Sequence, residues 1–212
     1  MPRSMPDLVG RLQGSFAEAR AFVQTIELLR SQQTGRKKAV TTNKARFAYE
    51  LAYLRAFAAW EAFLEESFLR YLCGYTHAVG PQTLVAPAVF CSTIHDAELR
   101  VLGGRSYILW HNPAHVVTRS QTHFVSGRHE VVLNSVLNRV EAFAAVRHHI
   151  AHQKRDTANQ FDAACITLCG HRLPGSRPGS FLRKTVPHVS PSKRWFELIL
   201  TDLESYAAQI TP

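Results

Sequence analysis

Apolar side chains recur every three or four residues over residues 43–72, and this pattern predicts one long helix, which Gly74 ends. The helix would carry a broad apolar arc made of two adjacent lines of side chains: Phe47, Leu51, Leu54 and Ala58 on one, and Tyr53, Phe57, Trp60, Leu64, Phe68 and Tyr71 on the other. An arc of this width is typical of a helix buried between several others. We therefore expect the chain to fold around this helix.

Carboxylates interrupt the apolar arc, since Glu50, Glu61 and Glu65 all fall inside it and Glu61 lies near its middle. An unpaired buried charge is costly, so a buried Glu61 would need a partner. Pairing with Arg147, or with a basic side chain of a neighbouring helix, is one interpretation. Partial exposure at the edge of the helix is the other, and the sequence leaves both open.

The same helical spacing recurs along the rest of the chain, whereas the period-two alternation of strands is rare. Asn112 is expected to cap a helix, and Asp156 or Thr157 to cap another. Further helices are expected at residues 6–32, 93–102, 112–126, 129–152, 156–170 and 193–210, with a basic loop rich in Pro, Gly and Ser at 171–192. The prediction is an all-α bundle of about five to seven helices that forms one domain over residues 1–212.

The chain is strongly basic, with a formal net charge of +9. This charge favours an acidic partner, with nucleic acid first and an anionic membrane surface second, over a basic protein without such a partner. No apolar stretch approaches the roughly 20 residues of a membrane span, so we expect no membrane insertion. The N-terminus lacks the features of a signal peptide and the four cysteines form no CxxC pair, which favours a reducing, cytoplasmic compartment.

Most of the excess charge lies in residues 147–194, which hold nine basic and two acidic side chains, a net charge of +7. A concentration of cations of this kind attracts polyanions. We expect contacts to an RNA backbone from Lys154, Arg155, Arg177, Arg183 and Lys184. A solvated basic loop over 171–194 is the alternative.

That segment opens with an arginine and three histidines within residues 147–152, and a zinc site is one interpretation of this run. His148 and His152 are four residues apart and could share a metal ion. However, His149 occupies the position that glutamate holds in an HExxH metalloprotease, and no third ligand is evident. Cys165, Cys169 and His171 could begin another zinc site, although two buried thiols would explain the cysteines as well.

Two further interpretations of the run remain. Cations at the end of a helix suit the helix dipole and need no other role. Alternatively, the run could cleave RNA without a metal: His152 would take the proton of a ribose 2′-hydroxyl, and Arg147 would stabilise the charge that builds on the phosphate. Five residues on a helix correspond to an offset of about 140°, so the pair would act either on a loosened helix end or across a groove shared with a second subunit.

Several segments together resemble the HEPN superfamily. Arg147-x4-His152, within residues 146–153, resembles its Arg-x4–6-His signature, and the Trp60-Glu61 pair resembles an aromatic-Glu pair on its second helix. Residues 110–113 and 179–182 fit larger bacterial members, such as those of the RiboL-PSP-HEPN type. The resemblance extends over roughly residues 10–210.

The resemblance implies a helical homodimer in which two Arg-x4-His motifs face each other across a cleft. It implies a metal-independent endoribonuclease of a toxin–antitoxin or phage-defence system, without a cofactor and with an antitoxin partner, either a nucleotidyltransferase or a small protein. Arg147 and His152 would be the catalytic pair, supported by Glu61 and by His148, which stands where the family often has asparagine. Because some members are not nucleases, the alternative is a non-catalytic dimerisation module that binds nucleotide, RNA or a partner protein.

Overall fold

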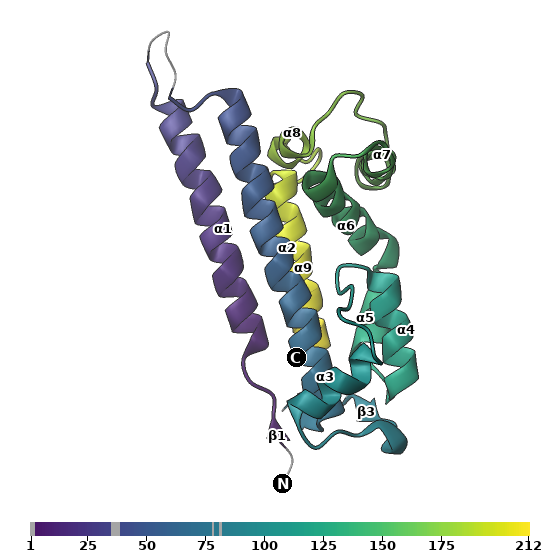
Figure 1. The fold of residues 1–212 in the computed structure, drawn as a ribbon. Helices are drawn as coiled ribbons and strands as arrows, with labels where there is room; N and C mark the ends of the chain where they lie inside the picture. The colour runs from purple at the N-terminus through teal and green to yellow at the C-terminus, as the bar shows by residue number, and fades with distance from the viewer. Residues whose placement is uncertain (1–2, 35–38, 78, 81) are drawn as a thin grey trace. The chain divides into compact units, whose positions relative to one another are not determined.

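The computed structural model describes residues 3–34, 39–77, 79–80 and 82–212, and helices dominate this part of the chain. The helices are α1 (Leu8–Ser31), α2 (Thr42–Leu72), α3 (Ile94–Leu102), α4 (Pro113–His123), α5 (Arg128–Ser135), α6 (Leu137–His152), α7 (Arg155–Cys169), α8 (Pro178–Arg183) and α9 (Trp195–Ile210), with a 3₁₀ turn at Pro87–Val89. The described residues also include four short strands: β1 (Arg3–Ser4), β2 (Tyr75–Thr76), β3 (Leu84–Val85) and β4 (Phe124–Ser126). The predicted all-α class is thus confirmed (Figure 1).

The chain groups into two compact units, which we describe separately. Unit 1 consists of residues 1–12, 60–141 and 204–212, and unit 2 of residues 13–59 and 142–203. Helices α1, α2, α6 and α9 contribute residues to both units.

Unit 1 is built around the ring of Phe68, which lies 4.8 Å from the ring of Phe124 and 5.4 Å from that of Trp110. Helices α4 and α5 pack against each other beside these rings, and β3 pairs with β4 in antiparallel fashion (Figure 1). Strand β1 pairs with β2 in parallel. These contacts bury the aromatic side chains that the helical spacing of α2 brings to one side.

Unit 2 holds the C-terminal end of α6 in place through a series of ring contacts. His149 on α6 stacks on Phe161 of α7 at 5.4 Å, Phe161 contacts Phe181 of α8 at 5.9 Å, and Phe181 stacks on Trp195 of α9 at 5.4 Å. In the same unit, residues 13–31 of α1 run beside residues 42–59 of α2 (Figure 1). The last turns of α6 therefore contact α7 directly, and through its Phe161 they are linked to α8 and α9.

Two predicted helix starts are confirmed, and a third differs. Thr93 caps α3 by accepting a hydrogen bond from the Asp96 amide at 3.1 Å, and Asn112 caps α4. At α7, however, the N-cap residue is Lys154, and Thr157 lies one turn inside the helix. The Thr157 hydroxyl accepts a hydrogen bond from the Lys154 backbone amide at 3.0 Å. This is the capping-box contact, in which a side chain of the first turn binds the amide of the N-cap residue.

Three predicted boundaries were wrong. The helix expected over 129–152 is two helices, because Val136 adopts φ −127° and ψ 17° and interrupts the hydrogen-bond ladder between α5 and α6. The helix expected to reach residue 126 ends at His123, where β4 begins. The loop expected over 171–192 contains α8, which Pro178 starts and whose Phe181 and Leu182 are fully buried.

The broad apolar arc on α2 is only half buried. The line from Tyr53 to Tyr71 lies in the interior, whereas Phe47 is 60% exposed and Leu51 is 45% exposed. Glu65 is exposed, and Glu61 is partly exposed. The expectation that α2 is surrounded on all of its apolar side was therefore wrong for the described chain, and an exposed apolar strip remains on residues 47–51 of unit 2.

Candidate active site

The C-terminal turns of α6 carry Arg147, His148, His149 and His152, all within unit 2. The buried Tyr53 hydroxyl of α2 donates to the carbonyl of Phe143 at 2.9 Å. That carbonyl lies one helical turn before Arg147, so this bond fixes the part of α6 from which the arginine projects. Burial raises the pKa of Tyr53 well above its usual range, so the hydroxyl keeps its proton and remains a donor.

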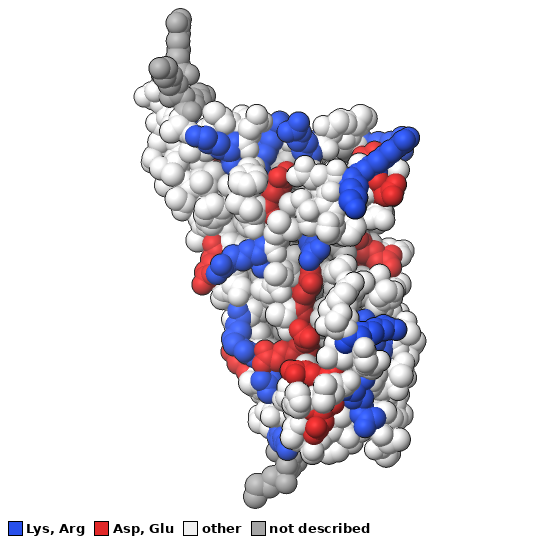
Figure 2. All heavy atoms as spheres, in the orientation of Figure 1, with Lys and Arg blue, Asp and Glu red and all other residues white. Residues whose placement is uncertain are grey.

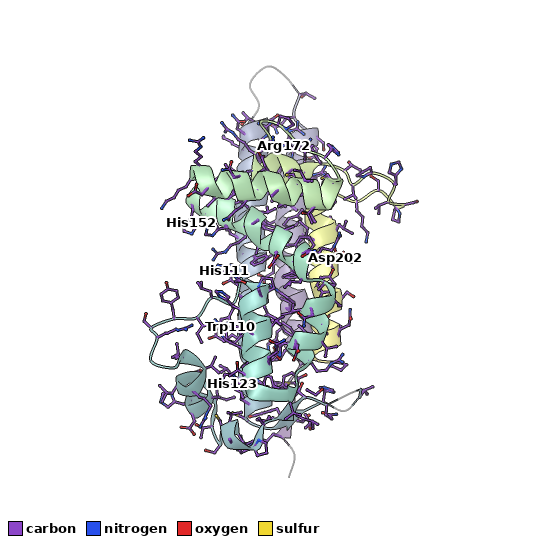
Figure 3. All side chains as sticks on the ribbon, turned by 90° about the vertical axis from the view of Figure 1, so that its right-hand side faces the viewer. Trp110, His111, His123, His152, Arg172 and Asp202 are labelled. Carbon is purple, nitrogen blue, oxygen red and sulfur yellow. The ribbon has the colours of Figure 1, made fainter. Side chains whose placement is uncertain are left out.

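His148 and His152 form a pair on one line of α6. Their ring centres lie 4.6 Å apart, with the planes inclined at 61°. The pKa of His148 is lowered, first by burial and then by the positive charges of His152, Arg147 and Lys154. His148 therefore tends to be neutral near neutral pH, and His152 lies exposed at the end of the helix (Figure 3).

His149 faces a different environment from its two neighbours. Its Nδ1 lies 3.0 Å from the hydroxyl of Thr157, and its ring stacks on Phe161. Burial lowers the pKa of His149, while Asp162 and Glu50 act in the opposite direction. This histidine links α6 to the first turn of α7.

A polar pocket of about 380 Å³ lies beside His149, within unit 2. Its walls include Arg46, Phe47, Glu50, His149, Gln153 and Arg177. Glu50 accepts a hydrogen bond from the backbone amide of Gly179 at 2.9 Å, whereas the buried Nε of Arg46 has no hydrogen-bond partner among the described residues. The pocket thus offers two guanidinium groups and an exposed aromatic ring next to the end of α6.

Glu61, predicted to support the catalytic pair, lies in unit 1, whereas Arg147 and His152 lie in unit 2. Within unit 1, the Glu61 carboxylate is 3.9 Å from Nδ1 of His111, and both side chains are about one-fifth exposed. His111 precedes Asn112, the cap of α4. His111 lies in the turn before α4 rather than in a helix, and Glu61 is partly exposed, so the structure shows a histidine neighbour together with the partial exposure that the other interpretation expected.

Four of the five side chains expected to contact RNA are exposed, namely Lys154, Arg155, Arg177 and Lys184. The fifth, Arg183, is engaged with Glu27 through Nε at 2.8 Å and Nη2 at 3.3 Å, so its guanidinium already has a bidentate partner. On the face shown in Figure 2, Lys and Arg lie at several separate places, with Asp and Glu between them. That face carries no continuous basic surface.

No group of three His, Cys, Asp or Glu side chains that could hold a metal ion occurs among the described residues. Burial raises the pKa of the Cys165 thiol to about 12, and that of Cys169 is raised by the same cause. Thiols with such pKa values remain protonated and are poor ligands and nucleophiles. The zinc interpretations of His148 with His152, and of Cys165, Cys169 and His171, thus gain no support from the geometry.

Comparisons with protein-family models, with curated proteins and with solved structures give no match to the chain. The resemblance to the HEPN superfamily therefore depends on the quoted residues alone. Within the described part of the chain, no helix combines the length and apolar character needed to cross a membrane.

Sequence reasoning missed several residues that shape this site. The helical spacing places Tyr53 in an apolar line and does not indicate the acceptor that a buried tyrosine hydroxyl needs. Glu50 had a signal, because a carboxylate inside an apolar arc requires a donor, and the donor is the Gly179 amide. The place of Phe47 and Arg46 in the pocket wall could not be predicted, because the pocket is formed by α2, α6 and α8, and local periodicity does not show which helices pack together.

Proposed function

We propose that this chain is a metal-independent endoribonuclease of a toxin–antitoxin or phage-defence system, with Arg147 and His152 as its catalytic pair. The observation that carries the proposal is the cluster at the end of α6, where the His148 and His152 rings are 4.6 Å apart. Burial, and after it the positive charges of His152 and Arg147, lower the pKa of His148. A fixed cation beside a pair of imidazoles suits phosphodiester cleavage, because the cation can stabilise the phosphate charge and an imidazole can carry the proton.

In the proposed reaction, neutral His152 takes the proton of a ribose 2′-hydroxyl, and the 2′-oxygen attacks the adjacent phosphorus. The bond from phosphorus to the 5′-oxygen breaks, and this oxygen takes up a proton from water. The hydroxide that remains takes the proton from His152, which restores the free base. The products are a 2′,3′-cyclic phosphate and a 5′-hydroxyl. Arg147 stabilises the charge on the phosphate, and His148 supports His152 as its ring neighbour.

A homodimer is part of the proposal, because Arg147 and His152 lie on different lines of one helix and would grip a phosphate better across a two-fold groove. Exposed apolar side chains of unit 2 offer a surface for the second copy, among them Phe22, Leu29, Phe47 and Leu51. Lys154, Arg155, Arg177 and Lys184 would hold the RNA backbone, with Arg46 in the adjacent pocket.

A non-catalytic module that binds nucleotide, RNA or a partner protein is the second candidate. The observation that favours it is the polar pocket beside His149, which could hold a ligand without any chemistry. An antitoxin, as either a nucleotidyltransferase or a small protein, is the partner expected for the nuclease.

Cleavage of a mixed RNA pool by wild-type protein should persist in excess EDTA, because no step needs a metal. Arg147→Gln should lower the cleavage rate by about 10²-fold, the usual effect of removing one donor to a developing phosphate charge. Arg172→Gln is the matched control, because it removes an exposed arginine outside the cluster. Inhibition by EDTA, or equal rates for the two variants, would contradict the proposal, and RNA binding without cleavage by the wild type would favour the second candidate.

A further inference from the structure

A second pocket lies wholly within unit 1 and contains none of the residues to which the proposed nuclease assigns a role. Its volume is about 410 Å³, and it is formed by the segment between α3 and α4 together with α4 itself. The side chains that matter for its chemistry are Arg105, Ser106, Tyr107, Leu109, His115 and Arg119.

The charged side chains in the wall of this pocket are both arginines, and no carboxylate is among its lining residues. Arg119 is half-buried, and its pKa is lowered, first by burial and then by the positive charge of Arg105. Arg119 is repelled by the positive charge of the exposed Arg105, so an anion in the pocket would be attracted by both guanidinium groups and would offset their repulsion.

Arg119 is held in a defined position. Its Nη1 donates to the carbonyl of Leu109 at 3.5 Å, and its guanidinium carbon lies 5.2 Å from the centre of the Trp110 ring. Trp110 is itself buried against Phe68, and Figure 3 shows it on the segment that leads to α4. Because a guanidinium has five N–H donors, Arg119 keeps donors for a ligand while its position is fixed by packing.

An exposed aromatic ring stands in the same wall. Tyr107 is 70% exposed, and Leu109 is 37% exposed. Exposure of such apolar surface to water is unfavourable, so a ligand that covers it would be favoured. An aromatic ring beside arginines can stack on a base while the arginines bind its phosphate. The Ser106 hydroxyl and the His115 ring add polar groups to the same wall.

We propose that this pocket binds a nucleotide, with the phosphate on Arg105 and Arg119 and the base against Tyr107. The nucleotide is either a free mononucleotide or one unit of a single-stranded RNA, since both present the same phosphate and base. This site does not require the cleavage reaction at Arg147 and His152.

Isothermal titration of the full chain with AMP, with adenosine and with a short 2′-O-methyl RNA tests the proposal. The 2′-O-methyl strand lacks the nucleophile of the proposed cleavage, so failure of the nuclease proposal leaves this binding measurement unaffected. We expect AMP to bind and adenosine to bind at least tenfold more weakly, because it lacks the phosphate. Tighter binding of AMP than of the strand would identify a free nucleotide as the ligand, and the reverse order would identify RNA.

Arg105→Gln should weaken binding of the preferred ligand by about tenfold, in line with the loss of one charge-assisted hydrogen bond. Arg100→Gln is the matched control, since Arg100 is exposed on neighbouring α3 but does not line the pocket, and it should change affinity less than twofold. Tyr107→Ala should also weaken binding, without altering thermal unfolding. The proposal is overturned if the wild type binds neither AMP nor the strand, or if Arg105→Gln and Arg100→Gln behave alike.

Discussion

Replacement of His152 by alanine is expected to lower the rate of RNA cleavage by about 10²- to 10⁴-fold, the usual contribution of a positioned acid–base group. His152 is exposed at the last residue of α6 and makes its ring contact with His148, so its removal should leave the fold intact. The rate is measured on a labelled RNA at neutral pH, with circular dichroism as the check on folding.

His171→Ala is the matched control for this experiment. His171 is also exposed and also lies in the basic segment, and its Nδ1 is 2.9 Å from the nearby carbonyl of Cys169. Its loss should leave the rate unchanged. Equal activity of the two variants would show that His152 has no part in the mechanism. If His152→Ala kept its activity and His148→Ala lost it, the proton transfer would be assigned to His148.

The second large effect concerns stability at acid pH and arises from His129 in unit 1. This histidine is fully buried, with Nε2 2.9 Å from the Ser67 hydroxyl and its ring 5.3 Å from that of Phe68. Burial lowers its pKa to about 3, and a hydrogen bond with the backbone of Leu64 acts in the opposite direction. Its Nδ1 has no hydrogen-bond partner among the described residues, so a proton there would be buried without an acceptor.

The stability contributed by neutral His129 is fully present above the pKa of about 6.5 that histidine has in the unfolded chain, because neither state is then protonated. Below that pH the unfolded chain takes up a proton and the folded protein does not, so the free energy of unfolding falls as the pH falls toward 3. The accumulated loss at pH 3 is about 4 to 5 kcal/mol for this group.

Urea unfolding of the wild type and of His129→Gln between pH 7 and pH 4 measures this effect. The glutamine amide can still donate to Ser67 but does not titrate, so the wild type should lose stability relative to the variant as the pH falls. A difference between the two proteins that stays constant over this range would show that His129 takes up its proton in the folded state as readily as in the unfolded chain, and would contradict the prediction.

Local chemistry made much of the fold predictable. The caps at Thr93 and Asn112 are properties of a few consecutive residues, and so is the end of α2 before Gly74. By contrast, the break at Val136 and the burial of α8 depend on tertiary packing, which overrides local periodicity. The exposed line of Phe47 and Leu51 shows the same limit, because periodicity indicates an apolar face but not what covers it.

The candidate site was predictable only where its residues are close in sequence. Arg147, His148 and His152 lie within two turns of one helix, so their proximity follows from helical geometry. The bond from Tyr53 to the Phe143 carbonyl joins residues 90 positions apart, and the pairing of Arg183 with Glu27 joins residues 156 apart. Such contacts decide which cations remain available to a substrate, and they need the folded chain.

The most direct test of the proposed mechanism compares an RNA oligonucleotide with a DNA of the same sequence, in excess EDTA, followed by mass spectrometry of the products. Attack by the 2′-hydroxyl requires RNA, so the account predicts cleavage of the RNA into fragments with 2′,3′-cyclic phosphate and 5′-hydroxyl ends, and no cleavage of the DNA. Cleavage of the DNA at a similar rate, or RNA fragments that carry 5′-phosphates, would contradict it.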